Sequence, residues 1–186
     1  MAQPSADSTA VGSTLGFKQL TLANWTEPDP VNRHFARISP LVGAVQMGES
    51  DWAREFLAVE LTETVPVQIR DLFAIARGAM LYGWFFYPLF RLGEEQLFRV
   101  LESAARLRYC EVGGGRTSPR YEEAVEYLGE RGVIASHQLE RWHAARQLRN
   151  MSSHPERATV VPPGMAARML RTTATDIDVL FATPAV

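Results

Sequence analysis

The spacing of apolar residues predicts helices over most of the chain after residue 50. Between residues 66 and 84, apolar positions recur at intervals of three, one and four, as expected where one face of an α-helix is buried. The same spacing recurs between 93 and 110, and Pro88 separates the two segments and closes the first. We therefore expect two long amphipathic helices. Their apolar stripes are Ile69, Leu72, Phe73, Ala76, Met80, Gly83 and Trp84, and then Leu97, Phe98, Leu101, Ala104 and Ala105.

Capping and helix-breaking residues place the other helices. Ser50 and Ser136 are suited to helix N-caps, and the glycine run at 113–115 breaks the helix before it. Pro155 ends another helix, because the residue before a proline is pushed out of the α region. The predicted fold is an all-α bundle of about five or six helices, in one domain spanning residues 49–186. Besides the two long helices, we expect helices at about 50–62, 119–131, 136–153 and 164–182.

Residues 1–48 do not show a helical pattern. Prolines and small polar residues interrupt this segment, and the alternation in residues 15–25 is consistent with either a strand or an extended arm. We expect residues 1–48 to form an irregular N-terminal arm that is partly ordered by packing. No sheet is predicted for the rest of the chain.

The composition indicates a globular protein of the cytoplasm. Hydrophobic residues make up 46% of the 186 positions and charged residues 22%, and the formal net charge is −2. This charge excludes a strongly basic nucleic-acid coat but not a local basic patch. Cys110 is the single cysteine, so an internal disulfide and a thiolate zinc cluster are both excluded. A reducing cytoplasm is therefore the expected location.

The most apolar window, residues 79–90, is too short to cross a membrane. It has twelve residues, whereas a membrane helix needs about 20, and Pro88 interrupts it. We expect this window to be a helix end buried in the core or in a subunit interface. Its aromatic residues at 84–90 favour packing over base stacking, because no arginine is interleaved among them. We expect no association with membranes.

Positive charge is concentrated late in the chain. Residues 131–171 contain seven arginines and two glutamates, a local charge of +5, whereas residues 1–70 contain eight acidic and five basic residues. Eighteen of the nineteen basic residues are arginine, which a GC-rich genome explains most simply. The alternative is selection for bidentate recognition of phosphate or carboxylate. The position of the arginines is thus more informative than their number.

Within this basic segment, Arg149 and Asn150 are followed by His154 at the end of a predicted helix. This Arg-Asn-x3-His pattern resembles the signature of the HEPN superfamily (higher eukaryotes and prokaryotes nucleotide-binding domains). In that family the motif lies near the end of a late helix in an α-helical bundle, and a further helix follows it. The resemblance covers about residues 65–182 and leaves the N-terminal arm outside.

The resemblance implies a metal-independent endoribonuclease without a cofactor, of the kind that serves as a toxin or defence effector. The ribose 2′-OH would attack the adjacent phosphorus, with His154 moving protons near neutral pH and Arg149 stabilising charge on the phosphoryl oxygens. Asn150 would orient the histidine or the phosphate, and Arg146 would contact the RNA backbone. Glu102, on the helix at 93–110, is a candidate to pair with Arg149. The implied partners are RNA or a nucleotide, a second copy of the chain in a homodimer, and an antitoxin or other protein.

Several alternatives stay open at the sequence level. Arg149 could form a structural ion pair, and His154 could cap carbonyls at its helix end. The chain could be a HEPN-like module that binds a nucleotide or a partner protein without cutting RNA, or an unrelated helical domain. Arg131 and His137 give a second match to a loose spacing, but they straddle a glycine and a helix cap. No metal ligand set is expected around the histidines.

Overall fold

The computed structural model confirms an all-α bundle. It describes residues 17–39, 41–152 and 162–184, with only the backbone described for 33–34, 37–39 and 146–152. A 3-10 helix and a short antiparallel hairpin, in which Ala36 pairs with Gln46, precede six α-helices. The elements are a 3-10 helix (Pro30–His34), β1 (Ala36–Ser39), β2 (Gly43–Gln46), α1 (Glu49–Leu57), α2 (Val67–Tyr82), α3 (Leu89–Glu111), α4 (Tyr121–Glu130), α5 (Ser136–Ser152) and α6 (Pro163–Ala182).

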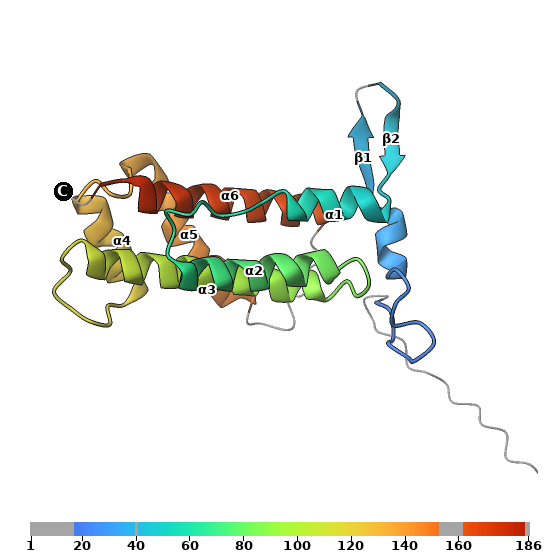
Figure 1. Cartoon of the computed structure of the whole chain (residues 1–186), viewed down its shortest axis with the longest axis horizontal. Helices are drawn as coiled ribbons and strands as arrows, with labels where there is room; N and C mark the ends of the chain where they lie inside the picture. Colours follow the sequence, from blue (N-terminus) through green and yellow to red (C-terminus); the bar gives the residue numbers. More distant parts are fainter. Residues whose placement is uncertain (1–16, 40, 153–161, 185–186) are drawn as a thin grey trace, which may run out of the picture.

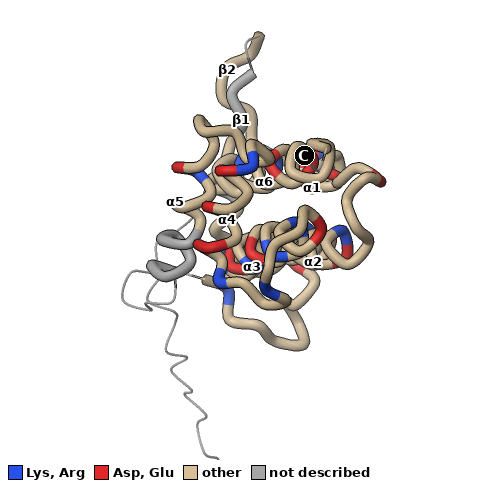
Figure 2. The backbone as a smooth tube through the Cα atoms, turned by 90° about the vertical axis from the view of Figure 1, so that its left-hand side faces the viewer, with Lys and Arg blue, Asp and Glu red and all other residues tan. Residues whose placement is uncertain are grey.

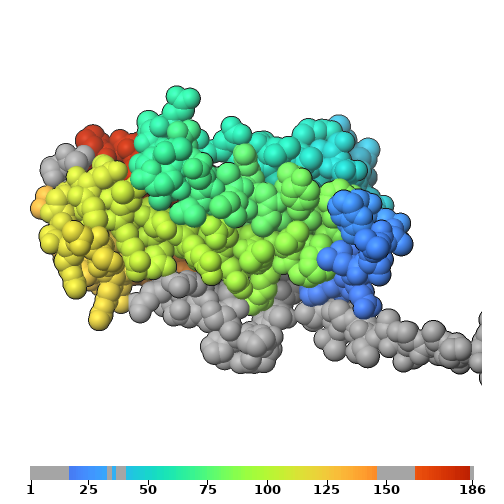
Figure 3. Space-filling view, turned by 60° about the horizontal axis from the view of Figure 1, so that its bottom comes forward, coloured from blue at the N-terminus to red at the C-terminus, as the bar shows by residue number. Residues whose placement is uncertain are grey.

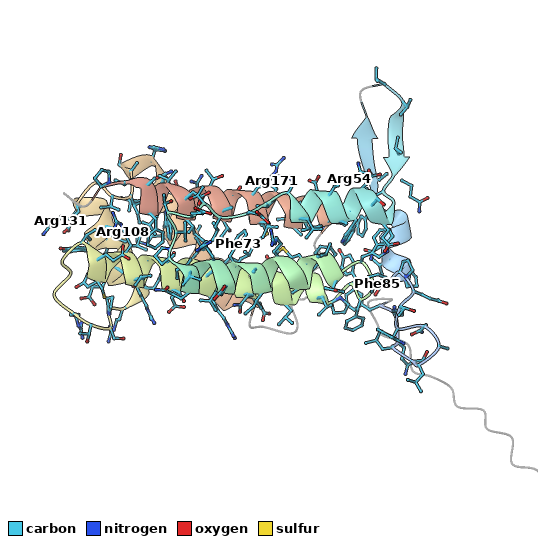
Figure 4. The ribbon with its side chains drawn as sticks, in the orientation of Figure 1. Arg54, Phe73, Phe85, Arg108, Arg131 and Arg171 are labelled. Atoms are coloured by element: carbon cyan, nitrogen blue, oxygen red, sulfur yellow. The ribbon has the colours of Figure 1, made fainter. Side chains whose placement is uncertain are left out.

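The helices pack in two main layers. Helices α2 and α3 run antiparallel in one layer, and α1 and α6 lie along the other, as Figure 1 shows. Phe73 of α2 lies between the layers and is buried, in line with the predicted stripe (Figure 4). At the end of the bundle near the C-terminus, α4 packs on α3 and α5, so that α5 is held against α3.

The start of α3 differs from the prediction. Helix α2 ends at Tyr82, and α3 begins at Leu89, four residues earlier than expected. The prediction treated Pro88 only as the end of the first helix. In the structure Pro88 immediately precedes α3, and its fixed φ suits the start of a helix.

Helix α1 is shorter than predicted. It ends at Leu57 instead of Thr62, and residues 58–66 form a connection to α2. The backbone N–H and the hydroxyl of Thr62 both donate to Oδ1 of Asp178 on α6, at 2.9 Å each. These hydrogen bonds give the backbone N–H of Thr62 a partner although this residue is outside a helix. The partner lies 116 positions away, so the local sequence does not reveal it.

The N-terminal arm contains structure that the sequence analysis missed. The hairpin of β1 and β2 projects from the bundle, and Gly43 begins β2 with a φ of +78°, a conformation that favours glycine (Figure 1). The described part of the 15–25 segment is not a strand but a loop with turns. No helix among the described residues is long and apolar enough to cross a membrane.

Candidate functional site

The residues of the HEPN-like motif lie on and after the last turns of α5. Arg146, Arg149 and Asn150 belong to this helix, although their side chains are outside the described part, and His154 lies outside the described residues altogether. Position 149 follows Trp142 by seven residues, which is two helical turns, so the two positions fall on the same side of α5. The Trp142 side chain is buried. Position 149 therefore shares its helical register with a buried position.

Polar residues from α3, α4 and α6 lie around the first half of α5. Asp176 of α6 is only 5% exposed and forms an ion pair with Arg141 of α5. The hydroxyl of Tyr121 on α4 donates to the backbone carbonyl of Trp142 at 2.7 Å. Glu102 of α3 lies close enough to Tyr121 to raise the pKa of its phenol, after burial and ahead of Asp176. We call Glu102, Tyr121, Arg141 and Asp176 the α5 polar cluster.

The electrostatics of this cluster are dominated by burial. Burial raises the pKa of Asp176 above its ordinary value, and Arg141 only partly offsets this by its charge and hydrogen bond. Burial also raises the pKa of Tyr121, so its phenol is neutral at physiological pH. The cluster thus holds one costly buried carboxylate beneath a half-exposed arginine.

Glu102, the candidate partner of Arg149, has a partner on its own helix. Its Oε1 lies 2.7 Å from Nη2 of Arg106, one turn further along α3. The predicted pair between Glu102 and Arg149 stays a prediction, because the Arg149 side chain is outside the described part.

The basic segment 131–171 does not form a single patch among its described side chains. Arg131 lies at the end of α4 with its guanidinium 5.1 Å from the ring centre of Tyr127, whereas Arg171 of α6 pairs with Glu55 of α1, within the α1–α6 layer (Figure 4). Arg141 is held by Asp176. Figure 2 shows basic and acidic positions interspersed along the described helices.

A large apolar pocket that the sequence pattern does not predict lies at the corner between α2 and α3. Its volume is about 730 Å³, and its walls are the loop of residues 20–28, the start of α1 and the 82–89 corner. In Figure 3 this loop, in blue, lies against the end of the bundle. The lining residues are Leu20, Trp25, Thr26, Pro28, Glu49, Tyr82, Phe85, Phe86 and Leu89.

Some residues of the apolar window 79–90 lie in the core, and others line this pocket. Tyr87 and Phe90 are buried in the core, as expected, but Tyr82 is 60% exposed and Phe85 and Phe86 are partly exposed at the pocket. The signal in the sequence was the contiguity of the aromatic run. Adjacent aromatic residues in a tight turn point in different directions, so they cannot all face one core.

Buried polar residues fix the loop that forms one wall of the pocket. The ammonium of Lys18, the single lysine, donates to the carbonyls of Asn24 at 2.9 Å and Glu27 at 2.6 Å. The carboxylate of Asp29, which is fully buried, accepts from the backbone N–H of Val31 at 3.1 Å and of Tyr87 at 2.9 Å. These bonds hold the loop in one position against the bundle.

Asn32 adds a second attachment to the same corner. Its Nδ2 donates to the carbonyls of Gly83 at 3.0 Å and Trp84 at 2.7 Å, just after the end of α2. The backbone N–H of Asp29 also donates to the carbonyl of Trp84, at 2.9 Å. Residues 29–32 are therefore part of the folded bundle.

Two other candidate features give little chemistry. Cys110 is exposed, and its thiol has only long contacts with the carbonyls of Arg116 and Thr117. Within the described residues, no group of three or more His, Cys, Asp and Glu side chains is placed to hold a metal ion.

Comparison with known proteins returned no match: no protein-family model, no curated protein and no solved structure is similar to this chain.

Proposed function

We propose that this chain is a metal-independent endoribonuclease of the HEPN type, with Arg149, Asn150 and His154 at its centre. The observation that carries the proposal is the Arg-Asn-x3-His pattern, whose first two residues occupy the last turns of a long helix of an all-α bundle. Helix α6 follows this segment. The register of position 149 with buried Trp142 also supports a site between α5 and its neighbours.

In the proposed reaction the ribose 2′-oxygen forms a bond to the adjacent phosphorus while the bond to the 5′-oxygen breaks. His154 accepts the proton of the 2′-OH, and the leaving 5′-oxygen takes up a proton from the imidazolium formed in this step. Arg149 donates hydrogen bonds to the phosphoryl oxygens as negative charge develops there. The products are a 2′,3′-cyclic phosphate and a 5′-OH, and DNA is not a substrate because it lacks the attacking hydroxyl.

The other residues have supporting roles in this proposal. Asn150 orients the histidine or the phosphate, and Arg146 contacts the RNA backbone. Glu102 is a positioning residue for Arg149. A homodimer places two copies of the motif on one RNA, so that a second Arg149 and His154 act near the same phosphate. The toxin or defence role belongs to the same proposal.

The test is RNA cleavage by the full chain in the presence of a metal chelator. We expect RNA, but not the same sequence with 2′-deoxy sugars, to be cut to fragments that end in a cyclic phosphate. His154→Ala and Arg149→Ala should each lower the rate at least 100-fold, on the basis of typical general acid–base and electrostatic contributions. His143→Ala, on the same helix, and Arg168→Ala, at an exposed position of α6, are the matched controls and should keep the rate. Equal rates for wild type and His154→Ala would refute the assignment.

The second candidate is a HEPN-like module that binds a nucleotide or a partner protein without cutting RNA. The observation that favours it is that arginines near α5 pair with carboxylates of the same chain, as in Arg141 with Asp176 and Arg106 with Glu102. Calorimetric titration with a nucleotide separates the two candidates. Binding that Arg149→Ala weakens, without any RNA cleavage by wild type, would favour the module.

A further inference from the structure

The pocket at the α2–α3 corner leaves large aromatic side chains open to solvent. Trp25 is 62% exposed and Tyr82 is 60% exposed, although each faces a concave surface. Aromatic surface left in water does not contribute the favourable free energy that its burial would supply. Their exposed position therefore does not stabilise the chain. It is explained by a ligand that covers them.

The pocket is also built from fixed parts. Its outer wall is held by Lys18, Asp29 and Asn32 through the hydrogen bonds described above, and its inner wall is the tight corner after α2. Phe85 lies at this corner, beside the N-terminal loop (Figure 4). A preformed site loses little conformational entropy when a ligand binds.

The charge of the lining selects the kind of ligand. Among the described residues, Glu49 supplies the single charged side chain of the pocket lining. It is exposed at the first turn of α1. The nearby ammonium of Lys18 is directed at carbonyls of the loop instead. With a carboxylate and no arginine in this lining, the pocket does not suit a phosphate-bearing ligand.

The arrangement of the aromatic rings favours a positively charged ligand. The rings of Tyr82 and Phe85 have centroids 6.3 Å apart and an interplanar angle of 38°, so they form two inclined walls. Trp25 and Phe86 add further ring surface to the lining. Faces of Trp, Tyr and Phe attract cations, most strongly quaternary ammonium groups that carry little hydration.

We propose that this pocket binds a small organic cation with apolar substituents, of the quaternary ammonium class. The apolar substituents contact Leu20 and the aromatic rings, and the positive charge lies near Glu49. The volume of about 730 Å³ is within the usual range for small-molecule sites. This inference does not depend on the ribonuclease proposal, because it uses none of the motif residues.

The test compares choline with 3,3-dimethylbutan-1-ol, in which a neutral carbon replaces the ammonium nitrogen at nearly the same shape. Calorimetric titration of the full chain should show at least tenfold tighter binding of choline. Trp25→Ala and Glu49→Gln should each weaken choline binding by about fivefold or more, whereas binding of the neutral alcohol should not respond to Glu49→Gln. Ile75→Ala, at an exposed position of α2 outside this lining, is the matched control and should leave choline binding unchanged.

Three outcomes would overturn the proposal. Equal affinity for choline and the alcohol would make the pocket simply apolar, and no binding of choline at millimolar concentration would remove the site. Unchanged choline binding in Trp25→Ala would place the ligand elsewhere. Because Trp25 and Glu49 are both exposed, their variants should keep the wild-type unfolding curve, which confirms that a loss of binding is local.

Discussion

Three buried polar residues, Lys18, Asp29 and Asn32, determine where the N-terminal segment lies. Each is nearly inaccessible to solvent, and each uses its side chain on backbone groups. A buried polar group without a hydrogen bond is costly, so such residues fix the chain to its partners. The sequence gives no indication of these contacts for Asp29 and Asn32, because their partners at 83–87 lie more than 50 positions away.

Asp29→Asn tests this role. The amide keeps the shape but replaces one acceptor with a donor, which then faces a backbone N–H of Val31 or Tyr87. We expect the free energy of unfolding to fall by about 2 kcal/mol in urea denaturation, as for a buried donor left unpaired. Asp71→Asn, at an exposed position of α2, should change it by less than about 0.5 kcal/mol. Equal effects of the two substitutions would contradict the assigned role.

Asp176 makes a prediction about pH. Because burial raises its pKa in the folded chain, the folded state binds a proton more readily than the unfolded state does. The resulting stability is fully present below the ordinary pKa of 3.8 and is lost as the pH rises through the raised folded-state pKa. Asp176→Asn removes this loss. The free energy of unfolding of Asp176→Asn minus that of wild type should therefore increase as the pH rises from 4 to 7.

Urea denaturation at several pH values measures this difference. Arg141 is half exposed, so water can solvate its guanidinium when Asp176 becomes neutral. Arg141→Gln should lower the free energy of unfolding at pH 7, since it removes the charge that lowers the pKa of Asp176. A stability difference between Asp176→Asn and wild type that is constant with pH would show that burial of this carboxylate is not costly.

At the scale of elements, apolar spacing located the helices, and contacts between helices set their ends. In the predicted stripe of α2, Ile69, Phe73, Ala76 and Met80 are buried and Leu72 is partly buried. The ends that the prediction missed depend on tertiary partners, as for Thr62 with Asp178 on α6. Helix α3 begins at Leu89, directly after Pro88, whereas the apolar pattern shows only the buried stripe further along the helix.

Two glycines on this helix pair should respond oppositely to alanine. A Cβ at Gly93 would lie 2.5 Å from Cγ of Met80 and 3.0 Å from the carbonyl oxygen of Ala76, whereas a Cβ at Gly78 would meet nothing within 4 Å. We expect Gly93→Ala to destabilise the chain by about 1–3 kcal/mol through overpacking. Gly78→Ala should stabilise it by up to about 1 kcal/mol, because alanine favours the helix. Thermal unfolding followed by circular dichroism measures both, and effects of the same sign would contradict the packing of α2 on α3.

At the scale of the whole molecule, the candidate chemistry was less accessible to prediction than the bundle. The local charge of +5 in residues 131–171 is a property of the sequence, but three of its arginines, Arg141, Arg171 and Arg131, contact Asp176, Glu55 and the ring of Tyr127 in separate parts of the molecule. The pocket at the α2–α3 corner joins residues around 25, 49 and 85. Such a site forms only when the chain has folded, so no local sequence motif predicts it.

The extent of the folded unit gives the last prediction. The sequence pattern predicts a boundary at residue 48, yet the rings of Phe17 and Phe35 stack on Tyr87 at centroid distances of 5.6 and 5.8 Å. A chain that starts at residue 36 loses these rings together with the hydrogen bonds of Asp29 and Asn32. From partial burial of two phenylalanines and about 1 kcal/mol per hydrogen bond, we expect a loss of roughly 4 kcal/mol or more in the free energy of unfolding.

Replacing residues 37–45 of the hairpin with a Gly-Ser linker should have little effect by comparison. The two strands pair with each other, and Leu41 at the tip is 93% exposed, so the hairpin adds little to the core. Urea denaturation of the two variants beside wild type locates the boundary. A large loss for the truncation with a small one for the linker would extend the folded unit to residue 17. Equal stability of all three chains would instead make residues 17–35 an appendage, because the bundle would then hold its corner without them.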